Sequence, residues 1–174
     1  ANSAVTVASG ATLMGDGPIG NLTIGGLVDP GNSAGARATL EVGAVTLQAG
    51  GSLRVDMSAV SGTAGTDWDL ITASTIAVNS TGKFTIYPSG SPTGFDSSKA
   101  YAWTIIAGTV SGFDAGSFTV DTSNFSHDLG GGSFSIESGS LQLKFTPRTP
   151  DAPTAFSATA TAADTIKLAF TKNS

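Results

Sequence analysis

A two-strand pattern that recurs along the chain constrains the fold more than any other feature of this sequence. The stretch AVTVASGATLMGD at 4–16 aligns with AVTLQAGGSLRVD at 44–56, at a constant offset of 40 residues. In each copy, apolar side chains alternate with small or polar ones, which is the period of a half-buried β-strand. Two further stretches fit the template, TIAVNSTGKFTIYP at 75–88 and GSFSIESGSLQLKF at 132–145.

The join between the two strands of a copy leaves two interpretations open. The strands form either antiparallel hairpins of a sandwich or successive sides of a coil in a β-solenoid. The joins ASGA, QAGG and NSTG lack Asn-Gly and Asp-Gly, the strongest short hairpin signals, so they favour corners of a solenoid. Further strands are expected at 21–24, 38–42, 67–73, 101–107 and 117–120, with loops extending from the coil at 58–66 and 88–99.

Composition points to the same all-β class. Of the 174 residues, 40% are hydrophobic, 12% are charged and 23 are glycines, and no segment has a helical apolar period.

The net charge of −5 argues against nucleic-acid binding. No apolar run is long enough for a membrane-spanning helix. The chain has no cysteine, which excludes disulfides and thiolate metal sites. No signal peptide is visible, so we expect the chain to be a fragment.

The segment NLTIGGLVDPGNSAGARATLEV at 21–42, followed by VTLQAGGSLRVDM and DWDLITASTIAV, resembles the autotransporter-associated β-strand repeat. The resemblance rests on the Pro-Gly-Asn-Ser-x-Gly turn before a Thr-containing strand. It implies a right-handed, single-stranded parallel β-helix over residues 1–146, with about five to seven coils. The turn residues are Pro30, Gly31, Asn32, Ser33 and Gly35.

These turn residues are expected to have a structural role at a corner. Pro30 has no amide hydrogen, so we expect it at a corner and not in a strand ladder. Gly31 and Gly35 would let the chain bend, and Asn32 and Ser33 would cap freed backbone groups.

The end of the chain has a different pattern. Residues 147–153 are predicted to be a Pro-rich linker. Residues 154–174 resemble the first two strands of a fibronectin type III domain, with PDAPTAFSATA and TIKLAFT as those strands. This incomplete segment is too short to bury an apolar face by itself.

Candidate chemistry is sparse, and no catalytic residue, metal site or cofactor is predicted. His127, the single histidine, lies in a Ser-His-Asp string. Adjacent residues of a strand point to opposite faces, so the three side chains cannot act together, and His127 is interpreted as a surface residue.

Asp67 and Asp69 flank Trp68, and the three are the candidate carbohydrate-binding residues. Capping of a turn is the alternative role for the two carboxylates. Tyr101 and Trp103 would share a core-facing side of their strand.

The sequence therefore predicts a non-catalytic structural segment, a stalk or spacer that displays other domains of a large bacterial protein. By the resemblance, that protein is secreted or lies at the cell surface, associated with the outer membrane. The alternative is an adhesin or carbohydrate-binding module on an exposed face of the β-helix, and a polysaccharide hydrolase or lyase is a third hypothesis. The expected partners are neighbouring domains of the same chain and an extracellular glycan or a host or cell surface. Neither nucleic-acid binding nor membrane insertion is expected.

Overall fold

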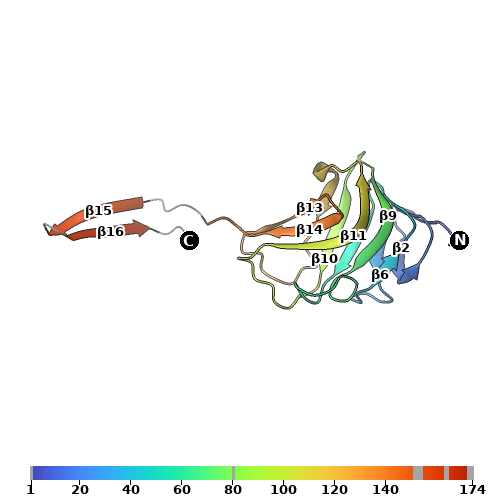
Figure 1. Cartoon of the computed structure of the whole chain (residues 1–174), viewed down its shortest axis with the longest axis horizontal. Coiled ribbons are helices and arrows are strands. Elements are labelled where there is room, and N and C mark those ends of the chain that lie inside the picture. Colours follow the sequence, from blue (N-terminus) through green and yellow to red (C-terminus); the bar gives the residue numbers. More distant parts are fainter. Residues whose placement is uncertain (1, 80, 151–154, 163–164, 172–174) are drawn as a thin grey trace.

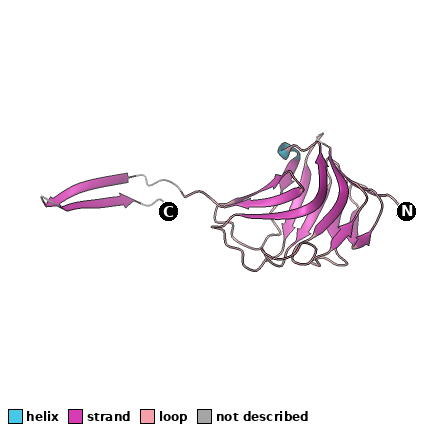
Figure 2. Cartoon of the chain, viewed as in Figure 1, coloured by secondary structure: helices cyan, strands magenta, loops and turns pink. Residues whose placement is uncertain are grey.

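The computed structural model describes residues 2–79, 81–150, 155–162 and 165–171. These residues form strands and loops, with one 3-10 turn at Ala115–Ser117 (Figure 2). In the described part of the chain, no helix is both long and apolar enough to cross a membrane. The prediction of an all-β chain is confirmed, and most of its strand pairs are parallel.

The larger sheet has nine strands, and its order follows the chain for most of its width (Figure 1). From β1 to β11, each strand on the main path pairs in parallel with the next. The short strand β3 pairs with β6, which lies beside the first half of β9, while β7 lies beside the second half. The strands of this sheet are β1 (Val5–Val7), β3 (Gly17–Pro18), β4 (Leu22–Ile24), β6 (Thr39–Glu41), β7 (Val45–Leu47), β9 (Leu70–Val78), β11 (Tyr101–Ser111), β13 (Ser133–Glu137) and β14 (Leu141–Thr146).

The second sheet has five strands in the order β12-β10-β8-β5-β2, and all of its pairs are parallel. In the copies at 4–16, 44–56 and 75–88, the first strand lies in the larger sheet and the second lies in this one. Their joins are therefore corners between sheets, and the hairpin interpretation is wrong for these three copies. The strands of the second sheet are β2 (Thr12–Gly15), β5 (Leu27–Pro30), β8 (Ser52–Asp56), β10 (Phe84–Ser89) and β12 (Phe118–Val120).

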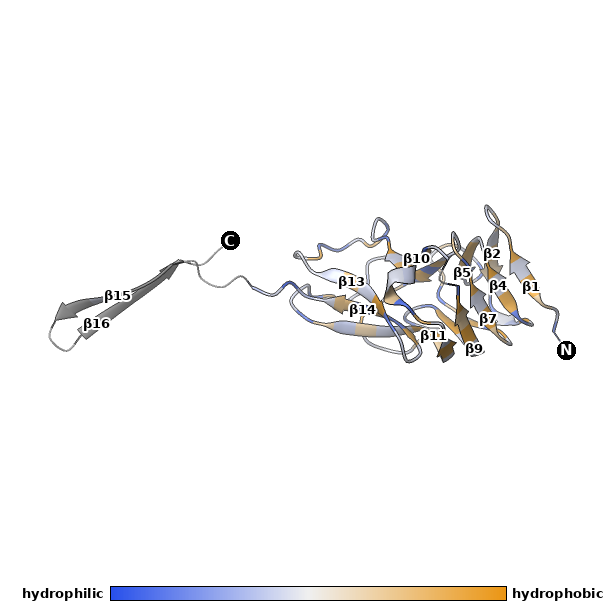
Figure 3. Ribbon diagram, turned by 90° about the horizontal axis from the view of Figure 1, so that it is seen from above, coloured by the Kyte–Doolittle hydropathy of each residue, from blue (hydrophilic) through white to orange (hydrophobic). Residues whose placement is uncertain are grey.

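The core consists of apolar columns, each made by residues at the same register position of successive strands. Figure 3 shows the apolar residues along the strands of both sheets. Stacking identical faces in this way removes most of the apolar surface from water, which stabilises the fold. One column in the larger sheet contains Val7, Ile24, Leu47 and Val78, and one in the second sheet contains Leu13, Val28, Leu53, Ile86 and Val120.

We call the parallel arrangement of both sheets the stack, and one strand of each sheet with its corner a step of the stack. The offset of 40 residues between the first two copies spans two such steps. Val5 pairs with Leu22, and Leu22 pairs with Val45, so β4 and β5 form a further copy between them. The sequence pattern hid this copy because its join is only Gly25 and Gly26. A Cβ atom at Gly26 would lie 2.3 Å from the carbonyl oxygen of Ala8, so only glycine fits this short corner.

The fourth predicted copy, at 132–145, is a hairpin and not a further step of the parallel stack. β13 and β14 pair antiparallel across a turn at Gly139, which has a φ of 122°. β14 then pairs antiparallel with the first half of β11. The hairpin covers part of the edge of β11, which would otherwise expose its unpaired backbone groups.

The predicted tail strands appear as a separate two-stranded antiparallel sheet (Figure 1). β15 (Ala155–Ala162) and β16 (Thr165–Thr171) agree in position with the two strands expected from the sequence. Residues 151–154, at the end of the predicted linker and the start of the predicted fibronectin-like segment, lie outside the described residues.

Candidate functional site

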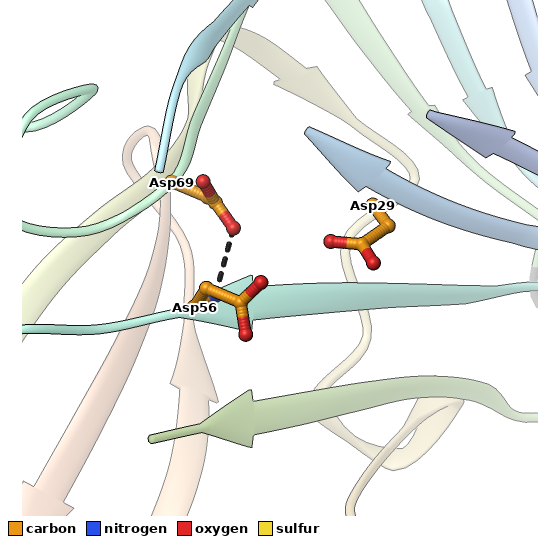
Figure 4. Close-up of side chains that lie close together, drawn as sticks. All are labelled: Asp29, Asp56 and Asp69. Atoms are coloured by element: carbon orange, nitrogen blue, oxygen red, sulfur yellow. Dashed lines mark hydrogen bonds between the residues drawn. The ribbon is translucent and has the colours of Figure 1, made fainter. Parts of the chain in front are cut away.

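Three buried carboxyl groups converge at the ends of strands from both sheets (Figure 4). Asp29 lies near the end of β5, Asp56 is the last residue of β8, and Asp69 directly precedes β9. Their exposed fractions are 2%, 3% and 2%, and one carboxylate oxygen of each lies within 4.8 Å of the others. We call these three residues the aspartate cluster.

Parallel pairing explains why two of these residues meet. β5 and β8 are parallel neighbours, so their carboxyl ends lie at the same edge of the second sheet. Asp69 reaches that edge because the loop after β8 returns alongside it, with a bridge between Met57 and Trp68. The amide of Asp56 donates a 2.7 Å hydrogen bond to Oδ2 of Asp69, which joins the strand end to the returning loop.

The Pro-Gly-Asn-Ser turn is attached to the aspartate cluster. The Gly35 amide donates to Oδ2 of Asp56 at 2.9 Å, and the Ala38 amide donates to Oδ1 of Asp69 at 2.9 Å. These bonds satisfy backbone donors of the loop that links β5 to β6. The corner device predicted from the sequence is therefore held by carboxylates from other parts of the chain.

The expectation for Pro30 is wrong, because it is the last residue of the β5 ladder and pairs with Gly15. Along β5, the backbone amides point alternately toward β2 and toward β8. The amide of Gly31 donates to the Gly15 carbonyl and so points toward β2. Pro30 therefore faces β8, where the ladder has already ended after Val28, so its missing amide hydrogen costs no ladder bond.

The other turn residues are expected to bend the chain or to cap its backbone groups. Gly31 and Gly35 have φ angles of 119° and 82°, as expected for a sharp bend. Asn32 and Ser33 are exposed, and the carbonyl of Ser33 accepts from the Ala36 amide. The carboxylate caps of this turn come from the aspartate cluster.

One guanidinium compensates part of the negative charge. Nη1 of Arg54 lies 3.3 Å from Oδ2 of Asp29. Among the described residues, Oδ1 of Asp29 and Nε of Arg54 are buried atoms without a hydrogen-bond partner. Burial, together with the nearby charge of Asp56, raises the pKa of Asp29 to about 6, although Arg54 opposes the shift.

The pKa of Asp69 is raised further, to about 7. Burial is the main cause, and the amide hydrogen bonds from Asp56 and Ala38 oppose it. The charges of Asp56 and Asp29 add to the increase. The cluster therefore binds protons near neutral pH unless another positive charge replaces them.

A surface cleft of about 510 Å³ reaches the cluster at Asp56. Arg37 and Arg54 line it together with Asp56, and serine and asparagine side chains complete a polar lining at Ser89, Ser91 and Asn124. In the described part of the chain, Asp56 is the one carboxylate that lines this cleft. Asp29 and Asp69 are outside the lining.

The three candidate carbohydrate-binding residues have separate contacts and do not form a common face. Oδ2 of Asp67 accepts from the Thr63 amide at 2.8 Å and so caps a turn. The indole of Trp68 is partly buried against the core, and its Nε1 donates to the Thr104 carbonyl at 3.0 Å. Asp69 belongs to the aspartate cluster. The capping alternative matches the contacts of both carboxylates.

A second group of aromatic residues packs around β11 and the hairpin. The expectation for Trp103 is confirmed, since it is 1% exposed and stacks on Tyr101 with the ring centroids 5.4 Å apart. The neighbouring rings are Phe95, Phe125, Phe134 and Phe145.

His127 has a serine neighbour that the sequence did not identify. Its Nε2 lies 3.3 Å from Oγ of Ser91 and 2.9 Å from the carbonyl oxygen of Pro92. A nitrogen that donates to a carbonyl cannot also accept the serine proton, so the pair lacks the geometry of a nucleophile and its base. The imidazole stacks on Phe95, which supports a packing role.

Sequence reasoning identified Asp69 as a candidate but missed Asp29, Asp56 and Arg54 as its neighbours. The three aspartates are far apart in the chain and meet only through the register of the second sheet and a returning loop. Two signals were available: Asp29 directly precedes the Pro-Gly turn, and Asp56 matches Asp16 in the repeat.

Comparisons of the chain with protein-family models, with curated proteins and with solved structures found no match.

Proposed function

We propose that residues 1–146 form a right-handed β-solenoid that acts as a non-catalytic spacer in a large secreted or cell-surface bacterial protein. In this proposal the protein resembles an autotransporter passenger, and the solenoid displays neighbouring domains of the same chain, beginning with the fibronectin-like segment at 154–174. The observation that carries the proposal is the parallel, in-register pairing of β1, β4, β7, β9 and β11 in one sheet and of β2, β5, β8, β10 and β12 in the other.

A spacer must hold a length and resist unfolding, and two features support this role. Each step of the stack separates strands by about 4.8 Å and repeats the same apolar column, so the length is set by the number of steps. The hairpin of β13 and β14 pairs with the end of the stack at β11, and burial of Leu143 and Phe145 attaches it there.

A modular stack should tolerate the loss of one whole step. Deletion of residues 22–44 joins Asn21 to Val45 and removes β4, β5 and β6, and we expect the shortened chain to keep a β-type circular dichroism spectrum and a cooperative thermal transition. Deletion of residues 22–33, which removes about half a step, should abolish that transition because the register is lost. Loss of cooperative unfolding in both deletions would contradict the solenoid.

Carbohydrate binding is the second candidate, and the polar cleft beside Asp56 is the observation that favours it. Arg37 and the hydroxyl groups of Ser89 and Ser91 offer the hydrogen-bonding groups that sugars use. A glycan array with the unchanged chain, Arg37→Ala and Trp68→Ala separates the two functions. Micromolar binding that is lost in Arg37→Ala but kept in Trp68→Ala would favour a carbohydrate-binding module at the cleft over a pure spacer, because Trp68 is partly buried and lies outside the cleft lining.

A further inference from the structure

The aspartate cluster combines three acidic side chains with an unsatisfied acceptor. Oδ1 of Asp29 is buried and accepts no hydrogen bond from any described residue, in a side chain that is 3% exposed. A buried carboxylate oxygen without a donor is costly and is rare in folded proteins. This atom therefore indicates a missing positively charged or donor group.

The charge balance indicates which group is missing. Three ionised carboxylates and the guanidinium of Arg54 leave two negative charges in a buried position. Uncompensated buried charge is strongly unfavourable, so the cluster needs either two protons or one divalent cation. Of these two alternatives, the close spacing of the three side chains and the unpartnered oxygen of Asp29 support the cation.

The donor set and its spacing select the cation. All three ligands are carboxylate oxygens, which hard cations prefer, and no nitrogen or sulfur donor belongs to the group. Ca²⁺ binds oxygen at about 2.3–2.6 Å, so two of its ligands can lie up to about 5 Å apart. The oxygens of Asp29, Asp56 and Asp69 lie within 4.8 Å of one another, a separation that Ca²⁺ can span. Ca²⁺ also accepts the irregular geometry of a protein site more readily than Mg²⁺, which requires a near-ideal octahedron and gives up its water reluctantly.

We propose that Asp29, Asp56 and Asp69 bind one Ca²⁺ ion under the 30–35 turn. The cleft provides access for the ion and for the water molecules that complete its coordination, since Asp56 lies in the cleft wall. Bound Ca²⁺ would fasten the turn to both sheets through side chains that already accept the Gly35 and Ala38 amides. The proposal does not depend on the spacer function, because any role of the domain is compatible with such a site.

Isothermal titration calorimetry of the whole 174-residue chain tests the proposal directly. After treatment with a chelator, at about pH 8, titration with CaCl₂ should show one site per chain, with a dissociation constant of about 10⁻⁵ to 10⁻³ M. MgCl₂ should bind at least about tenfold more weakly. The absence of a Ca²⁺ signal from the folded, unchanged chain would overturn the proposal without any variant.

Three variants localise the site. Asp29→Asn and Asp56→Asn should each weaken Ca²⁺ binding by at least about tenfold. Asp16→Asn is the matched control, because Asp16 occupies the repeat position of Asp56 but is exposed, and it should bind as the unchanged chain does. Asp29→Asn leaves the bonds to the Gly35 and Ala38 amides in place but removes the charged partner of Arg54, so its thermal transition is measured beside its Ca²⁺ binding. Binding that survives unchanged in Asp29→Asn would place the ion elsewhere and overturn the assignment.

Discussion

At the scale of single residues, the aspartate cluster holds several segments of the chain together by hydrogen bonds. Asp69 accepts amides from β8 and from the loop before β6, and Asp56 accepts the amide of Gly35. Three segments that are distant in sequence are thus held by two side chains. This arrangement is electrostatically unfavourable when the carboxyl groups are ionised, because they lie close together away from water.

The raised pKa values predict a pH dependence of stability in buffer that contains a chelator. The folded-state pKa values of Asp29 and Asp69, about 6 and about 7, lie above the ordinary value of 3.8. The folded chain therefore binds protons more tightly than the unfolded chain, and this stabilisation is complete below the ordinary pKa and is lost as pH rises through about 6 to 7.

Chemical denaturation between about pH 4 and pH 8 checks this expectation. At about 1.4 kcal/mol for each pKa unit, the shift of Asp29 corresponds to about 3 kcal/mol and that of Asp69 to about 4 kcal/mol, so the free energy of unfolding should fall by several kcal/mol across the window. The slope should flatten in Asp69→Asn and persist in Asp16→Asn. A stability that rises with pH through the window would contradict the assigned direction of the shifts.

At the scale of elements, the described turns of this chain use glycines wherever the backbone φ is positive, and the 30–35 turn shows two kinds of dependence. Gly31 has a φ of 119°, and a Cβ atom there would lie 2.4 Å from the Ala36 carbonyl oxygen. Gly35 has a φ of 82° but has open space around the position of a Cβ. The first glycine is needed for space and conformation, and the second for conformation alone.

This difference predicts unequal costs for the same substitution. Gly35→Ala should lower the free energy of unfolding by about 1–2 kcal/mol, the cost of a left-handed backbone conformation. Gly31→Ala should cost about 3 kcal/mol or more, because the clash with the Ala36 carbonyl adds to that strain. Urea denaturation of the two variants provides the comparison. Equal losses would mean that the turn relaxes around Gly31 without cost.

At the scale of the whole molecule, strands pair with their sequential neighbours, so stability should vary along the stack. Among the described residues, β1 and β2 each have a partner on one side, while β7 and β8 have partners on both sides. The outermost strands can open without disturbing the rest.

Native-state hydrogen exchange should therefore show a gradient. Amides of β1 and β2 should exchange at least about tenfold faster than those of β7 and β8. The hairpin end should be better protected than the β1 end, since Leu141, Leu143 and Phe145 are fully buried there. Uniform protection throughout residues 5–146 would indicate one cooperative unit and would argue against independent steps.

Local pattern was sufficient for most of the strands, because alternation along a short segment directly reflects which side chains face a core. It predicted the all-β class, the corners at 4–16 and 44–56, and the burial of Trp103. The same pattern failed at 132–145, where a hairpin and a corner have the same alternation and only pairing distinguishes them. It also missed the copy at 22–30, whose Gly25-Gly26 join is shorter than the template.

The sequence by itself thus determined most of the strand segments, the faces they bury and several of the sharp bends, since these depend on side-chain period and on glycine. Only the tertiary structure decided which strands pair, that Pro30 ends a ladder, and that Asp29, Asp56 and Asp69 meet. The physical reason is that strand register and loop return bring together residues that share no local pattern. The environment that raises the pKa of Asp29 and Asp69 exists only once those segments have packed.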